Sequence, residues 1–335
     1  QLDDTETCDR NLIGTGPYVL DEWLVNDRLT ADRNPDYWAT DEQGNQLPYL
    51  DRIELVPVVD SQNRVNGLLA GEYGAAMFRR AAPTEVLEAE SEAGAVGVNQ
   101  SVEGSQVAHL MLNHARPPFD DPQAREAVAL ALDRDRYREV VALGTTELAS
   151  GPFPPGSPGH LDDAGFPEHD LERARELVSD YEERTGSELE FSYLHSAIAE
   201  DTQAAQFVQE QLEAAGMQVT LQPREQATLI NEALGTNWQM MLVANFPGGE
   251  PDGNYVWWHS DSPVNLSRIQ DAELDSLLET ARSELDESAA TDRYEQVNLR
   301  LNEETHYIWL NQLKWTIATE PSISGVYGPT LPSGD

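Results

Sequence analysis

The chain is poor in cysteine and in basic residues, and each shortage excludes a class of protein. Cys8 is the only cysteine among 335 residues, so no disulfide forms within the chain, although Cys8 can pair with a cysteine outside it. The 21 basic residues stand against 60 acidic ones, for a net charge of −39. Proteins that bind nucleic acid or anionic lipid need a basic surface, so we expect neither partner. The scattered acidic residues are typical of extracellular or salt-adapted proteins.

Long apolar runs are also missing. No run approaches the ~20 residues that span a bilayer, and the first residues, QLDDTETCDR, lack the basic start and apolar stretch of a signal peptide. Either the protein is cytoplasmic or the chain begins downstream of the true start. The length indicates two or three domains.

Catalytic and metal-binding motifs are absent from the sequence. It contains no HExxH, CxxC, P-loop or GxSxG pattern, and its seven histidines do not show the i,i+4 spacing of helical zinc sites. Acidic pairs such as Asp120-Asp121 are expected to be solvated helix caps. We therefore expect neither an enzyme nor a bound metal or cofactor.

The stretch WQMMLVANFPGGEPDGNYVWWHS, residues 238–260, combines a short apolar run with a loop rich in proline, glycine and aromatic residues. The run has the length of a buried strand. A buried strand that ends in a polar and aromatic loop often builds a ligand pocket. The same rings would also serve to cap a domain core, and the stretch alone does not separate the two interpretations.

Apolar periodicity predicts alternating helices and strands after residue 120. Helices are expected at 121–132 and 133–141, and further apolar stripes lie in 171–181, 207–215 and 274–285. Strands are expected at 188–194, 218–221, 239–244, 306–313 and 314–319. This order predicts an α/β domain with a mixed or parallel sheet covered by helices.

The first 71 residues read as strands and turns. Strands are expected around 18–25, 29–33 and 53–55, with a hairpin-like break at Asn26-Asp27, and a short helix is expected from Ser61 to Gly71. Trp23 and Trp38 are expected to lie in the core.

Several motifs in fixed order resemble family 5 of the extracellular solute-binding proteins, the oligopeptide-, dipeptide- and nickel-binding components of ATP-driven importers. They are GTGPY, NPDYW, PYLDRI and LLAGE, followed by HLMLNHARPPFDD, the linker GPFPPGSPGH, LERARELV, and the long segments LDSLLETARSELD and YEQVNLRLNEE. The resemblance covers almost the whole chain.

The resemblance implies a two-lobed periplasmic-binding-protein fold of type II, similar to cluster C, with an incomplete first lobe. Residues 1–104 and 306–335 would form the β-rich part of lobe I, and residues 105–305 an α/β lobe II. Crossovers are expected at Gly104-Ser105 and near Tyr307, where a hinge is plausible. Because family members have a long part before GTGPY, we expect the chain to be the C-terminal portion of a longer protein.

The implied function is capture of an oligopeptide or similar polar solute between two lobes, for delivery to permease subunits of an ABC importer. The resemblance implies a monomer at the extracellular face of the cell membrane or in the periplasm, with a signal or lipid anchor upstream. An oligosaccharide-binding importer component is the alternative. An extracellular hydrolase and a sensor or adhesion module are further hypotheses.

The candidate ligand-binding residues come from the resemblance and from local chemistry. Relatives place an aspartate after the strand that ends at Ala244, where it pairs with a peptide's α-amino group; here the position is Asn245, and an amide cannot make that charge-assisted bond. Asp252 would replace the aspartate or structure a turn. An amide near aromatic rings would also suit a hydroxylated ligand. The full candidate set is Arg79, His109, Asn113, Asn245, Phe246, Asp252, Tyr255 and Trp258.

Three of these candidates each have a structural alternative. His109 and Asn113 lie on the strand that faces the ligand in relatives, but alternation along the strand would bury one of them. The rare basic pair Arg79-Arg80 would meet a ligand carboxylate or neutralise surrounding acids.

Overall fold

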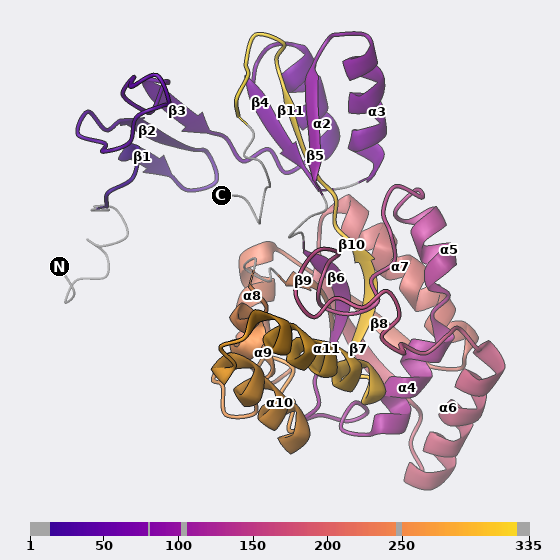
Figure 1. The fold of residues 1–335 in the computed structure, drawn as a ribbon. Helices are drawn as coiled ribbons and strands as arrows, with labels where there is room; N and C mark the ends of the chain where they lie inside the picture. Colours follow the sequence, from indigo (N-terminus) through magenta and orange to yellow (C-terminus); the bar gives the residue numbers. More distant parts are fainter. Residues whose placement is uncertain (1–13, 80, 102–105, 246–249, 327–335) are drawn as a thin grey trace. The chain divides into compact units, whose positions relative to one another are not determined.

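The computed structural model describes residues 14–79, 81–101, 106–245 and 250–326 (Figure 1). Cys8, Arg80, the expected crossover at Gly104-Ser105 and Phe246 lie outside these residues. The chain divides into two compact units, Gln1–Arg64 and Val65–Asp335.

The first unit contains an antiparallel sheet with the order β1-β2-β3. Its strands are β1 (Tyr18–Leu24), β2 (Arg28–Arg33) and β3 (Arg52–Leu55). Asn26 adopts a positive φ of 63°, and the Asp27 N–H donates to the Leu24 carbonyl at 3.0 Å, which closes the β1–β2 turn. Asparagine tolerates this left-handed conformation, so the predicted hairpin break is confirmed.

The prediction that Trp23 and Trp38 lie in the core is wrong. Trp23 is 47% exposed and Trp38 is 78% exposed. Most side chains of β1 and β3 are also exposed, because three short strands within this unit bury little surface. Aromatic identity alone therefore did not indicate burial here.

The second unit contains two sheets, and the smaller one has the order β4-β11-β5. Its strands are β4 (Ala75–Phe78), β11 (Trp315–Thr319) and β5 (Gly97–Ser101), with β11 antiparallel to both neighbours. Two helices, α2 (Ser61–Leu69) and α3 (Ala81–Glu92), accompany it. A small core joins these elements through Val65, Leu68, Phe78, Leu87, Val96 and Ala318.

The larger sheet has the order β10-β6-β9-β7-β8 and forms the main core. Its strands are β6 (Val107–Leu112), β7 (Glu190–Ser196), β8 (Gln218–Arg224), β9 (Met240–Asn245) and β10 (Tyr307–Gln312). β7 pairs in parallel with β8 and β9, whereas β6 is antiparallel to β9 and β10. Every residue of β6 and β10 is buried, as expected for strands covered on both faces. Of the two arrangements expected from the sequence, mixed or parallel, the sheet is mixed.

Helices surround this sheet (Figure 1). They are α4 (Pro122–Ala131), α5 (Arg134–Val140), α6 (Leu171–Thr185), α7 (Ala199–Ala214), α8 (Gln226–Leu234), the 3₁₀ turn η1 (Pro251–Asn254), α9 (Tyr255–Trp258), α10 (Ala272–Ser283) and α11 (Glu287–Glu303). Asp121, Asp133 and Asp170 cap the starts of α4, α5 and α6 by accepting backbone N–H groups. Part of the high acidic content is therefore explained by helix capping.

The closing segment contributes one strand to each sheet of the second unit. Tyr307 pairs with Met111 in the larger sheet, and Thr316 pairs with Phe78 in the smaller one. The lobe division expected from the sequence places the whole segment from 306 onward with the first lobe, whereas β10 lies in the α/β sheet.

Candidate functional site

The order of the strands defines a place for a ligand. The chain runs from β7 through α7 to β8, and then from β8 through α8 to β9, on the other side of β7. The direction of winding thus reverses between β7 and β9. In open α/β sheets, ligands bind in the crevice at the carboxyl ends of the strands at such a reversal.

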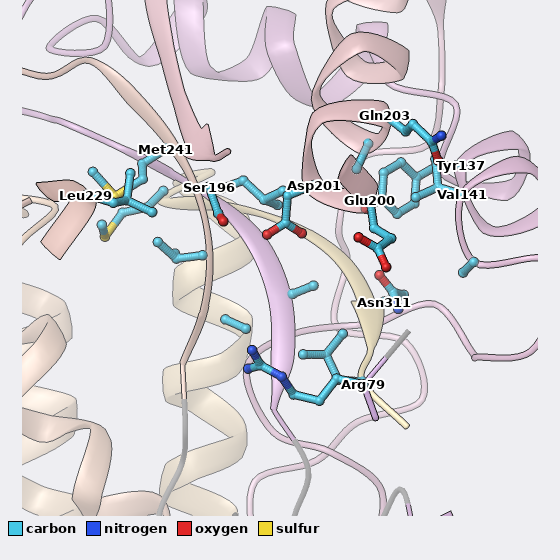
Figure 2. Close-up of a pocket in the computed structure, with 18 of the residues that line it drawn as sticks. Arg79, Tyr137, Val141, Ser196, Glu200, Asp201, Gln203, Leu229, Met241 and Asn311 are labelled. Carbon is cyan, nitrogen blue, oxygen red and sulfur yellow. The ribbon is translucent and has the colours of Figure 1, made fainter. Parts of the chain in front are cut away.

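A cavity of about 930 Å³ lies at this point (Figure 2). Ser196 at the end of β7 and Ala244 near the end of β9 both line it. Its walls come from α5, α7 and α8, from the end of β10 and from the segment after α9. The volume is within the range of pockets that hold small-molecule ligands.

One wall of the cavity is polar. It is formed by the start of α7, with Glu200, Asp201 and Gln203, together with Ser196 and Asn311. Figure 2 shows Asp201 and Ser196 in the middle of the view, with Glu200 and Gln203 on one side. Glu200 and Asp201 belong to the first turn of α7, where the helix dipole favours negative charge. The Asn311 amide donates to Thr146 Oγ1 at 3.0 Å, which fixes its orientation.

Arg79 brings a positive charge to the same cavity. It follows β4, and its guanidinium lies 5.3 Å from the centre of the Trp315 ring and donates to Gln106 Oε1 at 3.4 Å. A guanidinium offers several N–H donors in a planar fork, which matches a carboxylate. The cavity therefore combines carboxylates from α7 with a cation from a separate element.

Among the candidate residues whose side chains the structure describes, Arg79 alone lines this cavity. Asn245 ends β9 opposite Val107, and its neighbour Ala244 lines the cavity. Phe246 lies outside the described residues. The remaining candidates lie in the core or in a separate surface cluster.

His109 and Asn113 have structural surroundings. The His109 ring is buried against the edges of the stacked Tyr307 and Trp309 rings, with ring centroids 5.2 and 5.3 Å away, and its Nδ1 lies 2.9 Å from the Val107 carbonyl. Burial lowers the pKa of His109 to about 4. Asn113 is buried and donates to the Trp238 carbonyl at 2.8 Å. Both side chains therefore stabilise the sheet and its neighbouring turn.

Asp252 and Tyr255 belong to a stacked cluster on the surface. Arg282 donates to both carboxylate oxygens of Asp252, at 2.9 and 3.0 Å, and its guanidinium lies 3.7 Å from the centre of the Tyr255 ring. Tyr255 in turn stacks on His259 at 4.6 Å. Asp252 was expected either to replace the relatives' aspartate or to structure a turn, and this geometry favours the structural role.

Trp258 is a core residue that packs edge-to-face on Phe153 at 5.8 Å, with 1% of its surface exposed. Its neighbour Trp257 lines the cavity instead. The helical turn of α9 sends adjacent side chains in different directions, so the sequence indicated an aromatic loop without indicating which ring faces the ligand space.

The α7 and α8 residues of the cavity were not candidates from the sequence. Only their positions could have marked them as site residues, because Ser196 ends a strand and Glu200 lies in the first turn of the next helix. Recognising it requires the strand order, which local periodicity does not supply.

Within the part of the chain that the structure describes, no group of three or more histidine, cysteine or acidic side chains is arranged to hold a metal ion. In the same residues, no helix is both long enough and apolar enough to cross a bilayer.

Solved structures of similar fold define the class of protein. The oligopeptide-binding protein AppA of Bacillus subtilis, in complex with a nonapeptide, matches 100% of this chain and 67% of its own with a TM-score of 0.86 and 24% identity. NikA from Staphylococcus aureus, in complex with Ni(L-His)2, matches 99% of this chain and 69% of its own with a TM-score of 0.83 and 17% identity. The shared architecture is the α/β fold of type II periplasmic binding proteins.

The family follows from the sequence. The model for bacterial extracellular solute-binding proteins, family 5 middle, matches residues 1–267, and the chain belongs to this family. The predicted resemblance is confirmed.

Curated relatives include the di/tripeptide-binding protein 2 of Pseudomonas aeruginosa, which is 25% identical over 320 residues that cover 93% of this chain and 58% of that protein. The glutathione-binding protein GsiB of Salmonella typhimurium is 30% identical over 216 residues, which cover 62% of this chain and 39% of that protein. The chain spans 55–61% of the length of the first three curated relatives.

Proposed function

We propose that the cavity between the carboxyl ends of β7 and β9 captures a small peptide and that the chain is part of the substrate-binding component of an ABC importer. The observation that carries the proposal is that side chains of opposite charge line one cavity, with Glu200 and Asp201 on α7 and Arg79 after β4. A peptide carries a cationic and an anionic end, so it complements both.

The relatives support a peptide as the ligand. One of them is a di/tripeptide-binding protein, and a structural neighbour was solved with a nonapeptide. The oligosaccharide alternative relied on the neutral amide of Asn245 next to the rings of Tyr255 and Trp258. Tyr255 is stacked between Arg282 and His259, and Trp258 is buried, so neither ring has an open face for a sugar. We therefore favour the peptide over the sugar.

We further infer the setting in which this component works. Family 5 proteins are periplasmic or extracellular, so we place the protein at the extracellular face of the cell membrane or in the periplasm, with a secretion signal or a lipid anchor in the full-length protein. It would act as a monomer with permease subunits and without covalent chemistry. The two lobes expected from the sequence would close on the ligand about the segments that connect them.

Isothermal titration calorimetry on the full-length protein, with di- to pentapeptides, oligosaccharides and Ni²⁺, tests the proposal. We expect saturable binding of peptides, and a matching rise in the thermal midpoint because a ligand that binds only the native state stabilises it. Arg79→Ala and Glu200→Gln should each weaken that binding by about tenfold or more, since each loses one charge-assisted contact. Binding of sugars or nickel but not of peptides would contradict the proposal.

A further inference from the structure

Helix α8 presents large apolar side chains to the cavity. Ile230 and Leu234, one turn apart, are 52% and 55% exposed, and both line it. Leu229 and Ala233, also one turn apart, are buried and line the cavity as well. Exposed apolar side chains that gather at the edge of a cavity, instead of lying scattered singly over the surface, are a mark of a binding surface.

The apolar character continues onto the elements beside α8. Figure 2 shows Leu229 next to Met241 of β9, on the side of the cavity away from Glu200 and Gln203. Val264 and Leu266, from the segment after α9, line the cavity as well. The cavity is therefore divided, with α7 supplying a polar wall and α8 and its neighbours an apolar one.

The apolar wall is held in place by hydrogen bonds at both ends of α8. Glu225 caps its start by accepting the Ala227 N–H at 2.9 Å. At its end, the buried Trp238 indole donates to the Ala233 carbonyl at 3.2 Å, and Arg268 donates to the Leu234 carbonyl at 3.2 Å. A surface that is ordered before the ligand arrives loses little conformational entropy on binding.

We propose that the α8 wall is a subsite for an aliphatic or aromatic side chain of the ligand, so that the cavity selects peptides with at least one large apolar residue. This inference rests on the peptide-binding function proposed above and adds the substrate class. Burying a leucine or phenylalanine side chain gives roughly a tenfold to hundredfold gain in affinity over glycine, which sets the size of the expected selectivity.

Calorimetry on the full-length protein with tripeptides of one backbone length measures this selectivity. The probes are triglycine, triserine, trileucine and triphenylalanine, and the variants are Ile230→Asp and Leu234→Asp. Both positions are half-exposed, so the fold tolerates them, and the thermal midpoint of the free protein checks this. Leu285→Asp is the matched control, because Leu285 is 97% exposed and does not line the cavity.

We expect the wild type and the Leu285 variant to bind trileucine or triphenylalanine at least about tenfold more tightly than triserine, and both α8 variants to lose this preference while still binding triserine. Equal affinity of the wild type for all four probes would overturn the subsite and leave the peptide function standing. Equal weakening of every probe by the α8 variants would overturn it as well. Failure of the wild type to bind any peptide would remove the proposed function, and the subsite with it.

Discussion

His109 shows how a single buried side chain makes the protein sensitive to acid. Its Nδ1 lies within hydrogen-bond distance of a carbonyl, so Nδ1 carries the proton, and its buried Nε2 has no partner among the described residues. Protonation would place a charge against the stacked Tyr307 and Trp309 rings and add an N–H at Nε2 that has no acceptor among the described residues. This explains the direction of the change in the pKa of His109, which burial lowers to about 4.

We predict that stability falls between about pH 6.5 and pH 4 and that His109→Gln reduces this fall. In the unfolded chain the His109 pKa returns to about 6.5, so over this window the unfolded state binds more protons than the native state. The contribution of neutral His109 to the free energy of unfolding is fully present above pH 6.5. A loss on the order of 3 kcal/mol is expected by pH 4. Urea denaturation at a series of pH values measures the slope.

Because burial also lowers the pKa of His114 and His306, the variant keeps part of the slope. The wild type, measured over the same pH series, is the reference for the slope. A His109→Gln protein with an unchanged slope would contradict the prediction.

At the scale of elements, one carboxylate joins α10, α11 and β10. Asp271 caps α10 by accepting the Glu273 and Leu274 N–H groups, and it also accepts from Arg300 Nε at 2.8 Å and from His306 Nε2 at 3.0 Å. Burial alone raises its pKa, but the hydrogen bonds from His306 and Arg300 outweigh burial and hold that pKa well below its usual range. The carboxylate is therefore charged and paired in the core.

We predict that Asp271→Ala destabilises the protein by about 3–5 kcal/mol, because it leaves the Arg300 guanidinium without its most buried partner. Asp286→Ala, at the start of α11, removes a cap that accepts only the Ala289 N–H and should cost about 1 kcal/mol. Chemical denaturation of the two variants at neutral pH gives the comparison. Equal losses would mean that Asp271 acts as a helix cap alone.

The elements themselves were largely predictable, because their apolar periodicity matches what each one buries. The strand expected at 239–244 is β9 (Met240–Asn245), and the helix expected at 121–132 is α4 (Pro122–Ala131). Helix α8 (Gln226–Leu234) and the apolar wall that it forms were not predicted. In the α8 sequence QATLINEAL, the spacing of Leu229 and Ala233 is that of a helix that packs on a core. The neighbouring sequence does not distinguish the half-exposed Ile230 and Leu234 as residues that face a ligand.

At the scale of the whole molecule, the excess of acidic residues gives the protein a large net negative charge. Sixty acidic and 21 basic residues leave most carboxylates without a cation to pair with. Many ion pairs that do form are exposed, such as Arg173 with Glu176, and contribute little each. Repulsion among the rest opposes the compact state.

We predict that the thermal midpoint rises by several degrees between about 0.05 and 1 M NaCl, because salt shortens the Debye length from about 14 Å to about 3 Å and screens this repulsion. Scanning calorimetry across the series tests it. A parallel series in sucrose, which adds no ions, separates screening from general exclusion of the solute. A flat or falling midpoint in salt would contradict the prediction.

The family and the α/β class could be inferred from motifs spread along the chain, but the candidate site could not. Its residues come from at least five elements, from Arg79 after β4 to Asn311 in β10, and only the strand order brings them together. Asn245 and Ser196 each end a strand, yet only Asn245 was singled out, because it stands where the resembled family has an aspartate.

The position of β11 between β4 and β5 has a consequence for how the chain folds. β4 and β5 do not pair with each other, and β11 is the strand that joins them. Thr84 and Thr316, whose hydroxyls lie 3.3 Å apart, are separated by 232 positions in the sequence. The β4-β11-β5 sheet therefore forms only when segments far apart in the sequence meet, and contacts of such large sequence separation form slowly. We therefore expect the small sheet to form late in folding, with the facing edges of β4 and β5 left without their hydrogen-bond partner until β11 arrives.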